Sequence, residues 1–182
     1  MVKTILFRSY LVLLGLLAAY ALFGIIHFKW MYQRVDHPRA EFLITGNLDA
    51  PMSVVEFINY ECSPCKNLYP SVKELRRLRK DLRFIVRPVA SDEGPSNRLA
   101  RLSLAAGLQG KFWEMHDAIL ENPSLNISDA FIEQTALVYG LDYEKLQKDS
   151  QSKKVERFIK DNNSALGHSG VNVTPSFLVG TV

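Results

Sequence analysis

Two cysteines, Cys62 and Cys65, lie where a predicted strand passes into a predicted helix, and the chain has no others. The apolar, largely β-branched run over residues 54–58 indicates a short buried strand, and apolar residues at helical spacing after Cys65 indicate a helix. If that helix begins near Cys62, the spacing of three places both sulfurs on one helix face, close enough to bridge. The positive end of the helix would favour Cys62 as the thiolate, which is the nucleophile. This stretch therefore predicts thiol chemistry, with Cys62 as the attacking or substrate-linked sulfur and Cys65 as the resolving one.

The composition of the chain indicates a globular domain. Its 182 residues hold one domain comfortably, and a hydrophobic content of 47% is ample for a core. A formal net charge of +3 is too small to indicate nucleic acid as a partner, and no basic stripe interleaved with aromatic residues is present. Two cysteines are also too few for a disulfide-stapled scaffold.

Residues 9–28 form an apolar run without Asp, Glu, Lys or Arg, after a short flank over residues 1–8. This length is enough for one helical crossing of a bilayer. A cleaved signal peptide is the alternative, with a small-x-small site at residues 19–21, but the apolar run continues for seven residues beyond that site. We therefore expect an uncleaved, single-pass anchor, joined by a linker over residues 29–45 to a domain over residues 46–182.

Basic residues flank the apolar run on both sides, two before it and three after it: Lys3, Arg8, Lys29, Arg34 and Arg39. The larger number after the run weakly favours a cytoplasmic position for the domain that follows. The cysteine pair favours export, because disulfides persist in oxidising compartments. We give the cysteines more weight, and expect an anchor in the cytoplasmic (inner) membrane with the catalytic domain on the periplasmic or extracellular side.

The elements expected around the cysteines alternate as in an α/β domain. Residues 83–90 indicate a second strand, so that the β–α–β order implies a right-handed crossover and a parallel pair. Residues 95–166 are expected to be helical almost throughout. A strand pattern interrupted by Pro175 follows over residues 171–179, and a short strand is expected before the cysteines at residues 42–44.

The order of these elements carries a resemblance. A strand ending in Cys-x-x-Cys, a helix, a second strand, a helical block and a late Thr-Pro strand resemble the DsbA-like branch of the thioredoxin superfamily, over residues 43–180. Residues 46–51 (GNLDAP) fit that branch's G-x-x-D-A-P approach to the strand, and residues 111–117 (KFWEMHD) fit a phrase of its helical block. The resemblance implies an α/β, thioredoxin-like fold with a helical insertion at about residues 95–166.

Glu56 lies six positions before the first cysteine, where the resemblance expects an acidic residue. A carboxyl inside an apolar strand should have a raised pKa, because burial disfavours the charged form. Glu56 could then carry a proton for Cys65, which must lose its own to resolve a mixed disulfide. The alternatives are a Glu56 side chain that points to solvent at a strand edge or forms a structural pair.

The resemblance implies that the peptide bond before Pro175 is cis. It also implies that Pro175 faces a redox-active disulfide, here Cys62–Cys65, across the site. Only about 5–6% of X-Pro bonds in folded proteins are cis, so such a bond is usually held for a reason. Here it would expose the Thr174 backbone for strand-like pairing with an extended substrate segment. The alternative is an ordinary trans proline in an edge strand.

Together these features predict a thiol:disulfide oxidoreductase that acts on exported proteins, preferentially as a disulfide donor. The resemblance favours a donor, but it associates the residue type of Thr174, before the proline, with isomerases and reductases as well, so the direction of exchange stays open. A membrane redox partner is expected to reoxidise or reduce the cysteine pair. No cofactor and no metal are expected.

Two other interpretations of Cys62 and Cys65 remain. Soft thiolates select Cu(I) or Zn, so the chain could be a thiol-based metal-binding module or metallochaperone. A closed zinc site usually needs four ligands, which two cysteines and scattered histidines do not readily supply. A purely structural disulfide is the other interpretation, but so short a loop stabilises little in the chain-entropy account.

The sequence ends at Val182, where the resemblance calls for another strand and a terminal helix. Either the sequence is a fragment or the fold is shortened. A shortened fold would leave the strand over residues 171–179 as an apolar sheet edge.

Overall fold

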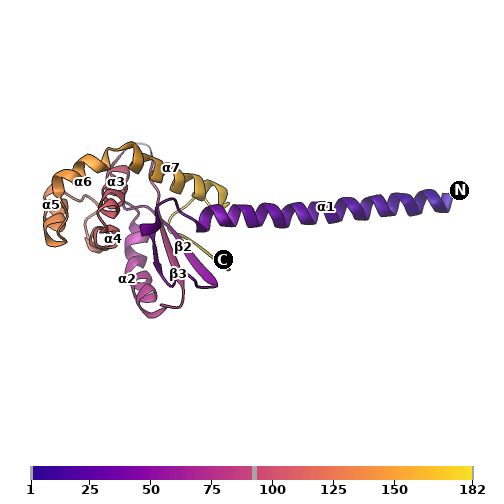
Figure 1. Cartoon of the computed structure of the whole chain (residues 1–182), viewed down its shortest axis with the longest axis horizontal. Helices are drawn as coiled ribbons and strands as arrows, with labels where there is room; N and C mark the ends of the chain where they lie inside the picture. The colour runs from indigo at the N-terminus through magenta and orange to yellow at the C-terminus, as the bar shows by residue number, and fades with distance from the viewer. Residues whose placement is uncertain (1, 92–93, 182) are drawn as a thin grey trace.

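A computed structural model of the chain describes residues 2–91 and 94–181 (Figure 1). Met1 and Val182, the outer ends of the expected flank and domain, lie outside that part. In chain order the helices are α1 (Val2–Asp36), the 3-10 turn η1 (Glu41–Leu43), α2 (Ser63–Leu78), α3 (Pro95–Leu108), α4 (Phe112–Glu121), α5 (Asp129–Val138), α6 (Tyr143–Ser150) and α7 (Lys153–His168). The strands are β1 (Ile44–Gly46), β2 (Met52–Ile58), β3 (Arg83–Pro88) and β4 (Ser176–Thr181).

The strands form one four-stranded sheet in the order β1–β3–β2–β4. β2 and β3 are parallel, as the β–α–β order predicted, and β1 and β4 run antiparallel to their neighbours. Val55 of β2 is paired with Ile85 of β3 on one side and with Leu178 of β4 on the other. β2 is thus an inner strand, and its carboxyl end leads directly to the cysteines.

Each face of the sheet packs against a different set of helices, because successive side chains of a strand point to opposite faces. On one face, Val54 and Ile58 of β2 share a core with three buried side chains of α2: Cys65, Tyr69 and Val72. On the other face, Val55 and Phe57 share a smaller core with Val35 of α1 and Ala165 of α7. The sheet therefore links the cysteine helix on one face to α1 and α7 on the other.

The helical block predicted over residues 95–166 is confirmed as α3 to α7. Figure 1 shows α3 to α6 gathered beside the sheet, at the end of the domain away from α1, while α7 runs back to the base of α1. Buried apolar residues of all five helices continue the core that lies under α2. The strand expected at residues 42–44 is only partly right, since η1 turns Leu43 into the core and β1 begins at Ile44.

α1 is the feature that differs most from the sequence prediction. It is a single helix that continues to Asp36 and projects from the domain as one long rod (Figure 1), so the first eight residues of the expected linker over 29–45 are helical. Val35 in this helical part is buried, and so are Ala40 and Leu43 in the rest of the segment. The segment differs from the prediction because it carries apolar side chains among its polar ones. These apolar side chains pack into the core of the domain.

Among the described residues, one helix is long and apolar enough to cross a membrane, over Tyr10–Asp36 of α1. Its apolar stretch is unburied, and it lies near the N-terminus, where a signal sequence would have the same properties. The structure thus agrees with a membrane-inserted segment at Tyr10–Asp36. This segment can be either an uncleaved anchor or a signal sequence.

Candidate active site

Cys62 occupies the N-cap position of α2, between the end of β2 and the first helical turn. Its backbone is extended, and its sulfur accepts a hydrogen bond from the Cys65 backbone N–H at 3.4 Å. Pro64 fits in the first turn because a residue there has no intrahelical partner for an N–H. The helix therefore directs a backbone donor and its positive end at the Cys62 sulfur.

The two cysteines differ in exposure. Both are free thiols, with Cys62 half-buried and Cys65 only 2% exposed. Burial raises the pKa of the Cys65 thiol to about 12, the Asn59 backbone opposes that rise, and the neighbouring Cys62 adds to it. Cys62 is thus the sulfur that a second protein can reach, and Cys65 stays protonated until a base removes its proton.

Thr174 and Pro175 are brought to the cysteines by the pairing of β4 with β2. The Cys62 thiol donates a hydrogen bond to the Thr174 carbonyl oxygen at 3.3 Å, across 112 positions of sequence. The Thr174–Pro175 peptide bond is cis, as the resemblance implies. Four of the five residues singled out from the sequence therefore meet at the start of α2.

Glu56 lies in β2, paired with Val86 of β3 and Phe177 of β4, and is 3% exposed. Desolvation raises the pKa of its carboxyl to about 7, against an opposing effect of the Arg76 guanidinium. It shares the sheet face on which Val54 and Ile58 pack with α2, so it lies on the Cys65 side of the sheet. The expected burial and raised pKa are present, and the proton-carrying role stays a prediction.

The loop before Cys62 is held by a contact that the sequence did not reveal. The Glu61 carboxylate accepts the Ser96 N–H at 2.8 Å, and the Asn59 side-chain oxygen accepts both the Ser96 hydroxyl and the Glu61 N–H at 2.8 Å. Ser96 is in the first turn of α3, whose N-cap, Gly94, has no side chain to cap it. Glu61, in the loop before Cys62, caps α3 instead. No local pattern in the sequence indicates this contact, because Glu61 and the start of α3 are far apart along the chain.

Next to this loop, a buried aromatic cluster encloses His116. Tyr60 and His116 share a hydrogen bond of 3.0 Å between the Tyr60 hydroxyl and Nδ1, and the rings of Phe112, Trp113 and Tyr69 surround the imidazole. Burial lowers the pKa of His116 to about 3, so the imidazole is neutral at physiological pH. His116 is thus a packed residue of the core.

The site offers few groups to a metal. Within residues 2–91 and 94–181, three or more His, Cys, Asp or Glu side chains do not come together in any place that could hold an ion. The cysteines instead face a backbone carbonyl and backbone amides. This arrangement suits bond exchange at sulfur.

The family model described as Thioredoxin matches residues 40–182, which include every residue of this site. The chain belongs to the thioredoxin family. The matched range covers the sheet, the cysteine helix, the helical block and the cis proline. It begins after α1, so the long apolar helix is an addition to the family domain.

Solved structures of thioredoxin-like proteins share this fold. A thioredoxin-like oxidoreductase from Silicibacter pomeroyi DSS-3 is 28% identical with a TM-score of 0.68, over 80% of this chain and 87% of that chain. The thiol-disulfide exchange protein alpha-DsbA2 from Wolbachia pipientis is 21% identical with a TM-score of 0.74, over 85% of this chain and 83% of its own. These likenesses and the family match confirm the predicted thioredoxin-like fold.

Curated relatives with a matching segment are much longer proteins. The Na(+)/H(+) antiporter NhaA 1 of Mycolicibacterium gilvum is 31% identical over 142 residues, which are 75% of this chain and 23% of the antiporter. The antiporter NhaA of Herminiimonas arsenicoxydans is 35% identical over 148 residues, 80% of this chain and 22% of its own length. The chain thus spans less than a quarter of the curated relatives it matches, and their names describe those whole proteins.

Proposed function

We propose that this chain exchanges disulfides with thiols of exported proteins through the Cys62–Cys65 pair, from a position tethered to the cytoplasmic membrane, and acts preferentially as a disulfide donor. The observation that carries the proposal is the placement of a half-buried Cys62 at the N-cap of α2, against the Thr174 carbonyl, with a buried Cys65 behind it. A reachable sulfur backed by a shielded one is the arrangement that two-step exchange requires.

As a donor, the chain would begin with its two sulfurs bridged. A substrate thiolate attacks the Cys62 sulfur, the Cys62–Cys65 bond breaks, and Cys65 leaves as a thiolate that takes up a proton. A second substrate thiolate then attacks the substrate sulfur bound to Cys62, which releases Cys62 as a thiolate and leaves a disulfide in the substrate. The substrate loses two electrons and the cysteine pair gains them.

Glu56 fits the proton step of this cycle. With a pKa of about 7, its carboxyl is present in both protonation states near neutral pH. It could therefore give a proton to Cys65 when that sulfur leaves, and take the proton back when the pair is reoxidised. The raised pKa of Cys65 makes such help valuable, because its thiolate is disfavoured in the buried site.

The hydrogen bonds at Cys62 bear on the direction of exchange. The Cys62 thiol donates a hydrogen bond to the Thr174 carbonyl oxygen, and it can do so only in the reduced protein, because a disulfide sulfur carries no proton. A stabilised reduced state makes the corresponding disulfide a stronger oxidant. The geometry therefore supports donation more than reduction of substrates.

The Thr174 carbonyl could bind the backbone of a substrate. Its carbonyl accepts the Cys62 thiol in the reduced protein, and this bond has no donor once Cys62 is part of a disulfide. In the oxidised protein that carbonyl is available to an N–H of an extended substrate segment, which would pair with it as a strand does. A membrane redox partner would then reoxidise the pair for the next cycle.

The purified protein (residues 1–182) in detergent, first oxidised and freed of excess oxidant, is mixed with a reduced peptide that has two cysteines. We expect one peptide disulfide per protein, with loss of this activity in Cys62→Ser and Cys65→Ser. Metal content of protein purified without chelator is measured on the same samples. Stoichiometric metal that depends on both cysteines, with no peptide oxidation, would support the metal-binding interpretation instead.

A further inference from the structure

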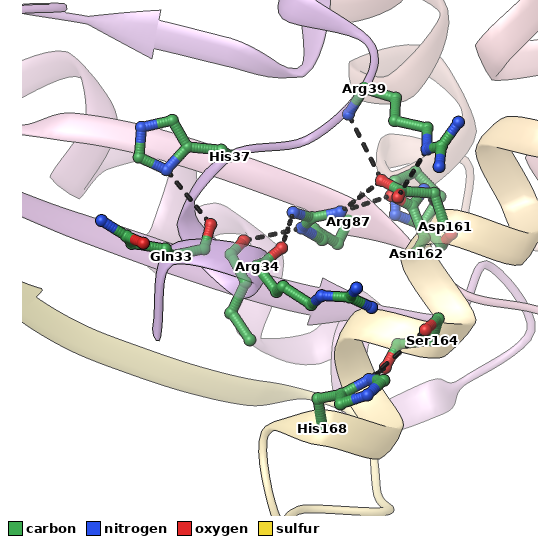
Figure 2. Close-up of polar contacts among 11 residues, drawn as sticks. Gln33, Arg34, His37, Arg39, Arg87, Asp161, Asn162, Ser164 and His168 are labelled. Atoms are coloured by element: carbon green, nitrogen blue, oxygen red, sulfur yellow. Dashed lines mark hydrogen bonds and ion pairs between the residues drawn. The ribbon is translucent and has the colours of Figure 1, made fainter. Parts of the chain in front are cut away.

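The end of α1 is bound to the domain through one buried guanidinium. Arg87 of β3 is 0% exposed and donates to the last carbonyls of α1, from Nη2 to Arg34 O and from Nε to Val35 O, both at 2.8 Å. Figure 2 shows Arg87 between the end of α1 and helix α7. Terminal carbonyls of a helix lack partners within the helix, and here a side chain from the sheet satisfies them.

The same guanidinium joins α1 to α7. Arg87 Nη1 donates to Asp161 Oδ2 at 3.0 Å and to Asn162 Oδ1 at 3.3 Å (Figure 2). Arg39, just after α1, donates to the Asp161 carboxylate from its backbone N–H at 3.3 Å and from Nε at 3.1 Å. One cluster of polar groups thus connects α1, the sheet and α7.

A second buried ion pair is formed by Arg83, which lies four residues before Arg87 in β3 and therefore on the same face of the sheet. Arg83 Nη1 contacts Asp36 Oδ2 at 2.7 Å, with side chains that are 8% and 1% exposed. Tyr32, one helical turn before Asp36, shares a hydrogen bond of 2.7 Å with Ser53 of β2. Val35 packs between these polar contacts in the core under Val55 and Phe57.

These contacts hold α1 and the domain in one fixed arrangement. Charges buried away from water are costly unless they stay paired, so separating α1 from the sheet would leave Arg83 and Asp36 without each other. It would also remove the Arg34 and Val35 carbonyls from the buried Arg87 guanidinium, which would keep only Asp161 and Asn162 of α7. α1 also continues without a break from the apolar run to Asp36, and the eight residues after Phe28 rise by about 12 Å. The first part of the linker expected over residues 29–45 is therefore helical as far as Asp36.

We infer that α1 is a rigid stalk that presents Cys62 at a fixed height above the membrane, and that the site's partner is a cysteine pair or disulfide of a membrane-held protein near the same height. The inference rests on the proposed function. With a flexible tether, the distance of Cys62 from the membrane would vary widely. With a rigid tether this distance is fixed, which raises the effective concentration of Cys62 for a partner held at the same distance from the membrane. The buried clusters around Arg83 and Arg87 supply that rigidity.

The rigidity is tested first by pulsed EPR in lipid nanodiscs. Spin labels are placed at the exposed positions Ile26 and Leu137, in a background in which both native cysteines are serine. The full chain should give a narrow distance distribution. A Gly-Ser insertion between Phe28 and Lys29, which leaves every docking contact in place, should broaden it. Equally broad distributions in both chains would overturn the inference.

The partner is tested with probe peptides in the same proteoliposomes as the reduced protein (residues 1–182). Each probe has a transmembrane helix, a polyproline arm that extends about 3.1 Å per residue, and a terminal cysteine bound to glutathione. Cys62 attacks the probe sulfur and releases glutathione, and Cys65 then attacks Cys62 and releases the probe thiol. A soluble peptide with the same cysteine and glutathione serves as the control.

We expect the rate to peak at one arm length, about tenfold above that of the longest and shortest arms. A seven-residue helical insertion between Phe28 and Lys29 should move the peak to an arm about 10 Å longer with nearly the same orientation, and the Gly-Ser insertion should remove the peak. All three proteins should react equally with the soluble peptide. A rate independent of arm length in the uninserted chain would overturn the inference and leave the proposed function standing. No reaction with any probe would overturn both.

Discussion

The Cys62 thiol lies 3.3 Å from the Thr174 carbonyl oxygen and donates a hydrogen bond to it, although 112 positions separate the two residues in the chain. The contact exists because β4 runs antiparallel to β2 and returns the Thr174–Pro175 segment to the start of α2. It places a backbone acceptor beside the sulfur that a substrate would attack. The free Thr174 backbone segment and the reachable sulfur therefore share one small region of the molecule.

The role of Glu56 as a proton carrier predicts a pH-dependent resolution step. The Glu56→Gln variant should resolve a preformed mixed disulfide between Cys62 and glutathione on the order of 100-fold more slowly at pH 7.5, because Cys65 then lacks its base. In the unaltered protein the rate should rise with pH and level off above about 7, where the carboxyl is ionised. Stopped-flow release of glutathione measures both. Identical pH profiles in the two proteins would assign Glu56 a structural role only.

Glu56 should also make folding stability depend on pH. Its pKa is raised from 4.5 to about 7 in the folded protein, so between these values the folded state binds more protons than the unfolded state and stability falls as pH rises. The shift corresponds to about 3 kcal/mol that is present below pH 4.5 and lost above pH 7. Relative to Glu56→Gln, the unaltered protein should lose about this free energy of unfolding between pH 4.5 and pH 8. Urea denaturation at both pH values measures it, and a constant difference between the two proteins would contradict it.

The buried pair between Asp36 and Arg83 predicts a large loss of stability when one partner is removed. Asp36→Ala should lower the free energy of unfolding by about 3–5 kcal/mol, because it leaves a buried guanidinium without its carboxylate. Arg79→Ala is the matched control, since it breaks an exposed pair with Asp81 and should cost under about 1 kcal/mol. Chemical denaturation of the full chain in detergent compares them. Equal effects of the two substitutions would show that the Asp36 pair is solvated.

The proposed topology predicts where the end of the chain lies. Two reporters are fused after Val182, one active only when exported and the other only in the cytosol. We expect activity from the exported reporter alone, and we expect the protein to stay in the membrane fraction after alkaline washing, because residues 9–28 remain attached. Activity from the cytosolic reporter would contradict both the topology and the role as a disulfide donor to exported proteins.

Local patterns in the sequence were enough to predict much of this fold. The strand before Cys62, the helix after it and the parallel second strand each follow from apolar periodicity over a few residues. Pro175 required the resemblance, because periodicity does not show which segment returns to the site. Burial of Glu56 was expected for the same local reason, as a carboxyl within an apolar strand.

What the sequence could not show depends on contacts between distant segments. Arg83 and Arg87 were part of a strand pattern, and their spacing of four placed them on one face, but nothing local identified the end of α1 as their partner. Glu61 likewise caps a helix that begins 34 positions later. A charged residue inside a buried strand is the signal that could have indicated such pairing, since buried charges require partners.

The most direct test of the account is covalent capture of substrates by the two single-cysteine variants of the full chain. Cells that express Cys65→Ser or Cys62→Ser are quenched with acid and run on a non-reducing gel. We expect high-mass, reductant-sensitive bands for Cys65→Ser, in which the reachable Cys62 attacks and nothing resolves the product. We expect few or none for Cys62→Ser, because the remaining thiol is buried. The same bands in both variants would contradict the assignment of Cys62 as the attacking sulfur and Cys65 as the resolving one.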